Sequence, residues 1–284
     1  MAKIFVGIVI YENSIFQIER LIRSIAYQSD CNDSVTIQFR ANDSRDYTES
    51  LNAIAKNIKS CNNIQIASPI SGKNIGFGAA HNNLASIALS AGADLYLGLN
   101  PDGMLHHRAI HELLLAWSAA PSDTLLELRQ FPEEHPKVYD CVTGETAWCS
   151  GAAFAMAPNR FIDLGGFDER LFMYCEDVDL SWRVRASGGH CRVAYSSLFL
   201  HDLSDGRTST KTRIQMLRSG RFLGWKWRIG ELERSCDEQM RTLGFHDPTA
   251  SDLSDETWRV GYERSVIDRV CKHRSAFDFS VMRW

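Results

Sequence analysis

Residues 4–10 read Ile-Phe-Val-Gly-Ile-Val-Ile, and this apolar run indicates how the first half of the chain folds. A continuous stretch rich in β-branched side chains is typical of a parallel strand that is covered on both faces. In the next segment, 15–25, isoleucine and leucine recur at helical spacing, and Asn13 or Ser14 can cap the start of that helix. The opening of the chain therefore predicts a buried strand followed by an amphipathic helix.

The same alternation continues to about residue 118. Apolar runs predict further strands at 35–39, 64–67 and 95–99, and helical patterns predict helices at 47–59, 79–90 and 108–118. A repeated strand–helix order predicts an α/β fold, with a Rossmann-like, mostly parallel central sheet and flanking helices. Open sheets of this kind bind ligands at the carboxyl ends of their strands, so we expect the functional residues in the turns that follow the strands.

The pattern changes after about residue 120, where Pro121, Pro132 and Pro136 interrupt short segments. Antiparallel strands or loops are favoured in this part, because proline marks turns and chain breaks. We expect a strand or strand pair at 147–157, a helix at 177–186 with Asp177 as its N-cap, and a short strand at 191–195.

Composition restricts the class of protein. Hydrophobic residues make up 44% and charged residues 23% of the 284 residues, which suits a globular domain and excludes a fibre or a disordered chain. The net charge of -4 argues against nucleic acid as a partner, because nucleic-acid-binding domains are usually basic. No apolar run is long enough to span a bilayer and acidic Glu12 comes too early for a signal peptide, so we expect a cytoplasmic protein.

A polar turn follows the fourth expected strand, where residues 97–102 read Leu-Gly-Leu-Asn-Pro-Asp. The turn presents Asn100 and Asp102 at the edge of the sheet where ligands bind. A carboxylate there suits a hard divalent cation, which prefers oxygen ligands and bridges to phosphates. Asn-Pro-Asp is also an ordinary turn sequence, and the turn by itself leaves both interpretations open.

Three acids crowd into four positions at Glu176, Asp177 and Asp179, after an aromatic stretch. One of these carboxylates is a candidate base that takes a proton from an attacking hydroxyl. Adjacent acids can also raise one another's pKa, which suits a base that works near neutrality. The structural alternative is that the acids only stabilise the first turn of a helix through its dipole.

Two further features are weaker when taken alone. Residues 73–82 read KNIGFGAAHN and offer glycines, backbone amides and a helix start that can face a phosphate or a sugar, but they lack the Walker pattern. His201 closes the apolar run 197–200, where a single histidine can be structural or can hold a ligand.

In order along the chain come the stretches YEN, NDS, NIGFGAAHN, LNPD, SGAAFAM, GGFDE, FMYCEDVDLSWR and a later histidine. This order resembles glycosyltransferase family 2, and more closely the rhamnosyltransferase-like members of bacterial surface-polysaccharide pathways such as O-antigen synthesis. The resemblance covers residues 3–205. It implies a GT-A fold, Mn²⁺ or Mg²⁺, and inverting transfer of a hexosyl or deoxyhexosyl (rhamnosyl-like) residue. The implied donor is a dTDP-, UDP- or GDP-linked sugar, and the implied acceptor is a saccharide or a polyprenyl-linked saccharide.

The resemblance also assigns roles to residues. It implies that Asp177 is the catalytic base with Glu176 beside it, and that Asp102 and His201 hold the metal. The donor-binding residues that it implies are Tyr11, Glu12, Asn13, Asn42, Asp43, Asn74, Gly76, Phe77, Gly78, His81, Asn100 and Asp102. The implied acceptor-binding residues are Gly151, Ala152, Gly166, Phe167 and Trp182. One departure is Ala41, which stands where many members carry an aspartate that contacts the base, so a one-residue gap would make Asp43 the equivalent.

We expect a catalytic domain over 1–205 and a helical C-terminal extension over 206–284. Within 207–230 basic side chains occur without an acid, and three aromatic residues, Phe222, Trp225 and Trp227, are interleaved. Such a segment can lie on the inner face of the cell membrane near a lipid-linked acceptor, or it can be a basic helix packed against the main domain. The rest of the extension is expected to cover the acceptor side or to form a homodimer contact.

Two other classes of protein stay open from the sequence. A non-catalytic nucleotide-sugar or saccharide-binding protein of the same fold is allowed by Ala41 and Asn100, but the intact acids disfavour it. A nucleotidyltransferase can share a similar sheet. That class needs a glycine-rich signature near the first strand, where the chain has only Gly7.

Overall fold

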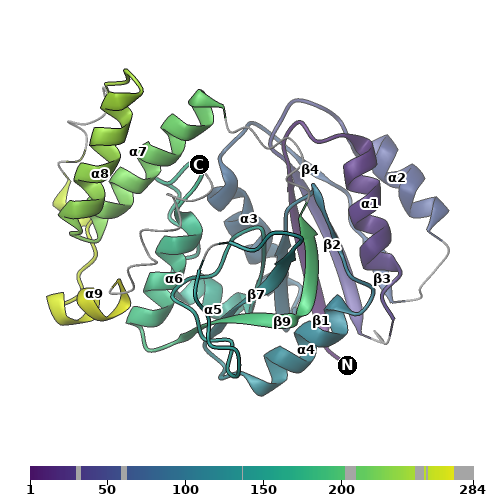
Figure 1. The fold of residues 1–284 in the computed structure, drawn as a ribbon. Helices are drawn as coiled ribbons and strands as arrows, with labels where there is room; N and C mark the ends of the chain where they lie inside the picture. Colours follow the sequence, from purple (N-terminus) through teal and green to yellow (C-terminus); the bar gives the residue numbers. More distant parts are fainter. Residues whose placement is uncertain are drawn as a thin grey trace.

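The computed structural model describes residues 1–29, 33–58, 63–135, 137–201, 209–246, 253 and 255–271. Its centre is a nine-stranded sheet in the order β3-β2-β1-β5-β8-β7-β9-β6, with β4 paired to β2 (Figure 1). The strands are β1 (Lys3–Ile10), β2 (Ser34–Ala41), β3 (Ile64–Ile66), β4 (Ile70–Ser71), β5 (Leu95–Leu99), β6 (Gly103–Leu105), β7 (Thr124–Phe131), β8 (Ala153–Met156) and β9 (His190–His201).

The helices flank this sheet and extend beyond it. They are α1 (Ile15–Ala26), α2 (Thr48–Asn57), α3 (Phe77–Ser90), α4 (Ala109–Ala119), α5 (Pro158–Asp163), α6 (Glu176–Ala186), α7 (Thr210–Lys226), α8 (Gly230–Thr242), the 3-10 turn η2 (Glu256–Trp258) and α9 (Arg264–Val270). The α/β class predicted from the sequence is therefore confirmed.

The first half of the sheet is parallel, as the strand–helix alternation predicted. β1 pairs in parallel with β2 on one side and with β5 on the other. Every residue of β1 after Lys3 is buried, which explains its uninterrupted apolar sequence. The predicted helix at 15–25 is confirmed as α1, and Ser14 caps it through a reciprocal capping box with Gln17.

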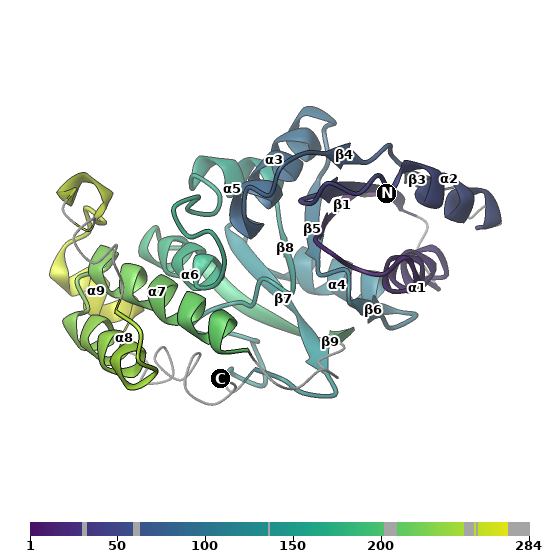
Figure 2. The same cartoon turned by 90° about the horizontal axis from the view of Figure 1, so that it is seen from above.

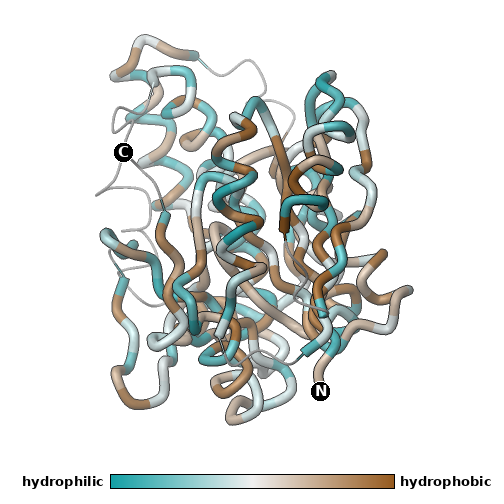
Figure 3. Tube along the Cα trace, turned by 90° about the vertical axis from the view of Figure 1, so that its right-hand side faces the viewer, coloured by the Kyte–Doolittle hydropathy of each residue, from teal (hydrophilic) through white to brown (hydrophobic). Residues whose placement is uncertain are grey.

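Helices cover both faces of the sheet (Figure 2). On one face α1, α2 and α4 bury side chains such as Ile22 and Ile110 against the strands. On the other face α3, α5 and α6 do the same with side chains such as Leu84 and Leu180. Apolar stretches accordingly run through the central strands (Figure 3). This burial on both faces leaves the turns at the strand ends as the exposed positions for chemistry.

The second half of the sheet departs from the sequence prediction. β8 is the only strand within 147–157, and it runs antiparallel to both β5 and β7. β7 and β9 pair in parallel, although loops or antiparallel strands were expected after residue 120. β9 is one strand of 12 residues that includes both the predicted strand 191–195 and the run up to His201. Long-range pairing decided these points, and local patterns do not record it.

The start of α6 also corrects a prediction. The helix begins at Glu176, with Cys175 and not Asp177 at the N-cap position. Tyr174 and Cys175 have φ values of 71° and 66°, a left-handed conformation that costs a non-glycine residue roughly 1–3 kcal/mol. The two residues turn the chain sharply, so that α6 starts with its three acids in the first turn.

The C-terminal helices are packed onto α6. An apolar cluster joins Trp182 of α6 to Trp227 and to side chains of α8 and α9, and the two indole rings lie 5.4 Å apart in a T-shaped arrangement. The predicted domain boundary at 205/206 falls outside the described residues, so the division into two domains stays a prediction. Among the helices of the described ranges, none combines the length and the apolar character needed to cross a membrane.

The interleaved aromatic residues do not form a membrane-facing surface. Trp225 and Trp227 are 4% and 0% exposed, because Arg259 stacks over Trp225 and Trp227 packs against Trp182 of α6. Lys226 between them is also buried, and its Nζ lies 2.6 Å from both Asp168 Oδ2 and Asp179 Oδ1. The segment therefore matches the packed-helix alternative, and membrane contact through these tryptophans is excluded. Contact through the other basic side chains stays a prediction.

Replacing Lys226 with Met should lower the free energy of unfolding by about 3 kcal/mol, because it removes the buried cation that Asp168 and Asp179 share and leaves each with one arginine. Urea denaturation followed by circular dichroism measures the loss. Lys211→Met, at an exposed position on the same helix, is the matched control and should change stability little. Equal losses in the two variants would contradict the role given to Lys226.

Candidate active site

The turn after β5 meets the end of β9. β6 pairs antiparallel with β9, and Gly103 stands opposite His201 in the register. This pairing brings His201 Nε2 to 3.5 Å from Asp102 Oδ1 and to 3.4 Å from Asn100 Nδ2. Asn100 and Asp102 of one turn and the distant His201 are therefore brought together at the edge of the sheet.

These side chains fit a divalent cation. Asp102 Oδ1 is buried and accepts no hydrogen bond, so a strong acceptor atom is left for a ligand. A carboxylate oxygen beside an imidazole nitrogen is a donor set that suits Mn²⁺. Within the described ranges, His, Cys, Asp and Glu do not gather in a group of three or more that could hold a metal. Asp102 and His201 are therefore the candidate ligands for a cation at this edge within those ranges.

Asp177 lies on the other side of the same sheet edge. Its Oδ2 accepts a hydrogen bond of 2.9 Å from the amide of Gly151, and its Oδ1 accepts one of 2.8 Å from Val178. Burial raises the pKa of Asp177 above its ordinary value, although these two amide hydrogen bonds oppose the shift. The carboxylate is consequently a stronger base than an exposed aspartate, while the side chain keeps partial access to solvent.

Glu176 differs from Asp177 in its surroundings. It is 5% exposed, lies against the first turn of α3 near Gly78, and its Oε2 has no hydrogen-bond partner. Burial, and after it the charge of Asp177, raises the pKa of Glu176 well above its ordinary value. Asp177 therefore ionises before Glu176 as the pH rises. The sequence suggested that each acid raises the pKa of the other. Burial is instead the largest cause of both shifts, and the effect of the neighbouring acid's charge acts on Glu176.

Two hydrogen bonds connect the Asn100–Asp102 turn to Asp177 of α6. The amide of Asn100 donates to the carbonyl of Ala152 at 2.8 Å, directly beyond the β5–β8 pairing. The neighbouring amide, of Gly151, donates to Asp177. A side chain at Gly151 would lie 3.2 Å from Phe77 and 3.4 Å from the Asp177 Cβ, so the glycine allows this close approach. The turn that carries Asp102 is thus connected through Ala152 and Gly151 to Asp177 in the first turn of α6.

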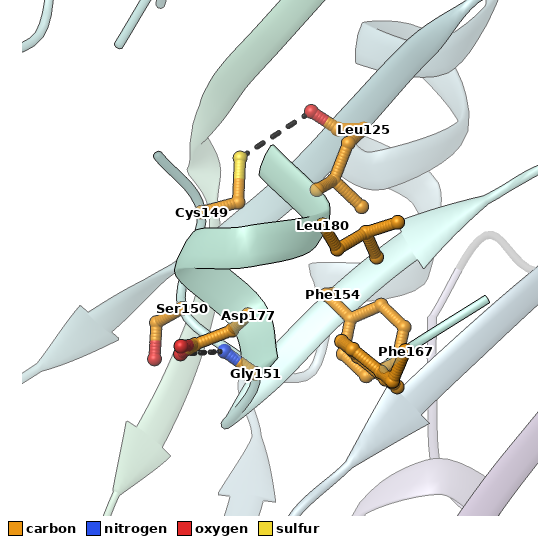
Figure 4. A pocket seen from close by; sticks show the side chains of 8 residues that line it. All are labelled: Leu125, Cys149, Ser150, Gly151, Phe154, Phe167, Asp177 and Leu180. Atoms are coloured by element: carbon orange, nitrogen blue, oxygen red, sulfur yellow. Dashed lines mark hydrogen bonds between the residues drawn. The ribbon is translucent and has the colours of Figure 1, made fainter. Parts of the chain in front are cut away.

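Figure 4 shows the Asp177 side chain beside Ser150 and Gly151, with Cys149, Phe154 and Phe167 around it. The space between these side chains is too narrow to admit a water molecule. It is a packing gap on the buried side of Asp177. The sugar would have to approach Asp177 from its solvent-accessible side.

The predicted donor-side loop is held by its own hydrogen bonds. Asn42, at the end of β2, donates from Nδ2 to the Gly76 carbonyl at 3.0 Å, and Asn74 Oδ1 accepts from the Gly76 amide. Gly76 has φ 89°, and a Cβ there would lie 2.5 Å from the carbonyl oxygen of Phe172. Glycine is therefore required at this position, and the loop links β2 to the segment before α6. Asn42 Oδ1 remains buried without a partner.

The turn after β1 is tied to Asp43. Asp43 Oδ2 accepts from the amide of Glu12 at 2.7 Å and also binds Arg45 and Tyr47. Although burial opposes it, hydrogen bonding by these partners holds the pKa of Asp43 below its ordinary value. The sequence left open whether Ala41 or Asp43 corresponds to the aspartate that contacts the base in many family members. At this turn Asp43 supplies the carboxylate, whereas Ala41 is fully buried at the end of β2. Its contact with a nucleotide base stays a prediction.

The same turn leaves two of its predicted donor residues near solvent. Tyr11 is 47% exposed, and its amide donates to Asn13 Oδ1 at 3.0 Å. Glu12 has a left-handed backbone with φ 58°. An exposed aromatic ring beside the sheet edge is compatible with stacking on a nucleotide base.

Three predicted binding residues are core residues. His81 and Trp182 are 0% exposed and Phe167 is 2% exposed, so none of them can contact a sugar. Burial lowers the pKa of His81 to about 3, and its Nδ1 lies 2.7 Å from the Tyr96 hydroxyl. The family motif predicted substrate contacts for these residues, but they build the aromatic core beneath the site.

Two of the predicted glycines serve the same core. A Cβ at Gly78 would lie 2.8 Å from Phe167 Cβ, and one at Gly166 would lie 2.4 Å from Asn82 Oδ1. Both glycines therefore permit close packing of α3 against the loop before α6. The predicted substrate contacts of these two glycines are replaced by this structural role.

Sequence patterns missed the polar residues of β7. Glu127 and Gln130 are 3% and 2% exposed, and Gln130 Oε1 lies 2.9 Å from His201 Nδ1. The signal that would have revealed them is the pair of long polar side chains within the otherwise apolar run Leu125–Leu128 and its continuation. Arg20, which donates to the carbonyl of Asp102 at 2.6 Å, was also missed because it lies 82 residues away in the sequence.

Solved structures with this arrangement are glycosyltransferases. The mannosyltransferase PcManGT of Pyrobaculum calidifontis, in complex with GDP-Man and Mn²⁺, matches 99% of this chain and 83% of its own with a TM-score of 0.58 at 14% identity. S. aureus TarS 1–349 matches 99% of this chain and 75% of its own with a TM-score of 0.58, and GalNAc-T7 with UDP, GalNAc and Mn²⁺ matches 90% and 54% with a TM-score of 0.62, both at 14% identity. The chain therefore has the GT-A glycosyltransferase fold, as predicted.

Sequence relatives narrow the resemblance to rhamnosyltransferases. The rhamnosyltransferase WbbL of Escherichia coli K12 is 29% identical over 154 residues, which are 42% of this chain and 58% of WbbL. N-acetylglucosaminyl-diphospho-decaprenol L-rhamnosyltransferase of Mycobacterium tuberculosis is 38% identical over 85 residues, which are 30% of this chain and 24% of that protein. The chain thus spans less than two thirds of either relative. No family model matches it. The predicted likeness to rhamnosyltransferase-like proteins is confirmed.

Glu176→Gln should stabilise the protein above the ordinary carboxyl pKa of 4.5. Because the folded-state pKa is raised, wild type has its full stability below 4.5 and loses stability as the pH rises toward and through the folded-state value. Glutamine cannot ionise, so the variant should gain about 1–3 kcal/mol over wild type at high pH and nothing in acid. Urea denaturation across pH measures this difference. Glu231→Gln, at an exposed position of α8, is the control, and a pH-independent difference at Glu176 would contradict the assignment.

Proposed function

We propose that this protein is an inverting glycosyltransferase that moves a rhamnosyl-like deoxyhexosyl or hexosyl residue from a nucleoside-diphosphate sugar to a saccharide hydroxyl. One observation carries the proposal: consecutive hydrogen bonds join the Asn100–Asp102 turn to Ala152 and the adjacent Gly151 to Asp177. Such a transfer requires a carboxylate that binds the cation and, close to it, a group that accepts the proton.

The proposed mechanism gives Asp177 the proton. Asp177 accepts the proton of the acceptor hydroxyl, whose oxygen forms the new bond to the anomeric carbon as the bond to the diphosphate breaks. The electron pair of the broken bond leaves with the nucleoside diphosphate. Glu176, which is buried beside Asp177 and has a pKa well above its ordinary value, would leave the negative charge on Asp177. The amide of Gly151 keeps the Asp177 carboxylate oriented.

Asp102 and His201 are the residues that would hold a divalent cation. When bound, Mn²⁺ or Mg²⁺ would offset the negative charge that develops on the departing diphosphate. The Asp102 backbone is fixed by Arg20, so the carboxylate is presented from a rigid turn. The complexes of PcManGT with GDP-Man and Mn²⁺ and of GalNAc-T7 with UDP, GalNAc and Mn²⁺ support the choice of cation.

The proposed acceptor is a saccharide, either free or linked to a polyprenyl diphosphate. The name of the M. tuberculosis relative describes a lipid-linked N-acetylglucosaminyl acceptor and an L-rhamnosyl product, which supports this class. The experiment that tests the whole proposal is a donor screen. Purified protein with Mn²⁺ and UDP-, dTDP- or GDP-sugars should release free nucleotide faster when a saccharide acceptor is added, and release from no donor would reject the function.

Asp177→Asn should reduce turnover by about a hundredfold or more, because the amide cannot accept the acceptor proton. Donor binding, measured by calorimetry with the donor found in the screen, should remain near that of wild type. In wild type, turnover should rise with pH through the raised pKa of Asp177. Asp163→Asn, on the exposed end of α5, should leave both quantities unchanged. A variant at position 177 with wild-type turnover would remove the base from the mechanism.

Asp102→Asn should raise the Mn²⁺ concentration for half-maximal turnover by at least the roughly 10–100-fold that changes around metal sites cause. The reason is that a neutral amide replaces the one carboxylate of the proposed site. EDTA should abolish wild-type turnover, and excess Mn²⁺ or Mg²⁺ should restore it. Full activity in EDTA would show that the transfer needs no cation.

A further inference from the structure

A buried polar network runs along β7 beneath the proposed metal site. It begins at His201, whose Nδ1 lies 2.9 Å from Gln130 Oε1. Gln130 Nε2 donates to Glu127 Oε1 at 3.3 Å. Glu127 Oε2 accepts from Lys137 Nζ and, at 2.6 Å, from the amide of Ser150. The side chains of Glu127 and Lys137 are 3% and 4% exposed, so the network is shielded from water.

The chemistry of these groups fixes the direction of each hydrogen bond. A carboxylate only accepts, so the side-chain nitrogen of Gln130 must face Glu127. The oxygen of the same amide must then face His201, and it can only accept. His201 Nδ1 is therefore the protonated nitrogen, and the lone pair of Nε2 points toward Asp102 and Asn100. This order follows from donor and acceptor types, so the alternative amide orientation is excluded.

We propose that Gln130 and Glu127 are positioning residues, which select the His201 tautomer with a free Nε2 and so prepare that nitrogen to bind a metal ion. The inference rests on the proposed function in treating His201 as a metal ligand. Outer partners of this kind orient metal-binding histidines and make them better ligands. Lys137 forms an ion pair with Glu127, and Glu127 accepts the hydrogen bond from Gln130.

The sheet is irregular beside the network. The pairing of β7 with β9 shifts register between Leu128 and Arg129, so that Leu128 stands opposite Ala194 and Arg129 opposite Leu198. The extra residues, 195–197, lie on β9, and the strand that carries a bulge is the one that bends. The irregularity therefore precedes the last residues of β9, which end at His201 and pair with β7 beside Gln130.

The network also reaches the second half of the site. Ser150 donates its amide to Glu127, and the next amide, of Gly151, donates to Asp177. One short turn is thus held at consecutive amides by a positioning residue and by the proposed base. Gln130 hydrogen-bonds to His201 and to Glu127, and the Ser150–Gly151 turn separates it from Asp177, which allows its role to be tested separately from proton transfer.

The first test reads the tautomer directly in the wild-type protein. Nitrogen-15 NMR of the histidine side chains at about pH 8, where an ordinary histidine is neutral, reports which ring nitrogen carries the proton. The chain has nine histidines, and the His201 signals are those that disappear in His201→Gln. The expected result is a proton on Nδ1. A proton on Nε2 would overturn the proposal without any variant of β7.

The second test uses Gln130→Leu, which removes the acceptor for Nδ1 while filling a similar volume. The Nδ1-protonated fraction of His201 should fall, and the Mn²⁺ dissociation constant, measured from the EPR signal of free Mn²⁺, should rise about 10–100-fold. Gln130→Glu should keep the proton on Nδ1, because a carboxyl oxygen still accepts a hydrogen bond from His201. A residue that only fills space would change unfolding temperature without changing tautomer or affinity.

Arg129→Gln is the matched control on the same strand, since Arg129 is half-exposed and pairs with Glu134 outside the network. It should leave the tautomer and the Mn²⁺ affinity unchanged. Unaltered values in Gln130→Leu, or equal changes in Arg129→Gln, would overturn the proposal. Neither readout needs turnover, so an inactive donor screen would reject the glycosyltransferase function while leaving the tautomer result to decide this inference.

Discussion

The antiparallel pairing of β8 with β5 is the contact on which the site depends. β5 ends at Leu99 opposite Ala153, and the hydrogen bond from Asn100 to Ala152 continues the ladder past the end of the strand. Without this pairing, the turn that carries Asp102 would have no fixed relation to the loop that holds Asp177. A parallel strand in the same place would have put its own end at this edge, and not the Gly151 turn that precedes β8.

Unequal burial then divides the work between neighbouring acids. Glu176 is enclosed against α3 and Asp177 is only partly covered, so their pKa values rise to different extents. Asp179, one turn further along the buried side, behaves differently again. Burial opposes its ionisation, but Arg183 and Lys226 hold its pKa below the ordinary value. Three acids within four positions thus acquire three chemical characters from the side of α6 on which each one lies.

Much of the fold followed from local patterns, and the reason is physical. Buried parallel strands and amphipathic helices leave periodic sequence signals, as β1 and α1 show. The parallel pairing of β7 with β9 joins residues such as Thr124 and His190, which are far apart in the sequence, and leaves no such signal. Asp102 and His201 met as the family resemblance implied. His81, Phe167 and Trp182 did not reach the surface, because a motif records that residues recur together and not which of them are exposed.

The second half of the site was also beyond local patterns. Gln130 and Glu127 lie three apart on β7, and no spacing rule for a regular strand brings such residues together. The missed contact of Arg20 with the Asp102 turn has the same origin, since it depends on how α1 packs beside β6. Composition and periodicity constrain single elements, whereas the functional atoms here are aligned by contacts between elements.

The packing of α7 onto α6 limits how this protein can be re-engineered. Asp179 binds Lys226 and Trp227 on the far side of the helix that carries Asp177. Exchanging the C-terminal helices for those of a relative would therefore strip partners from a buried acid two residues from the proposed base. A functional chimera would therefore need a junction that keeps α6 and α7 from the same parent. The helix that carries Asp177 and the C-terminal helix that supports it would then be inherited as one unit.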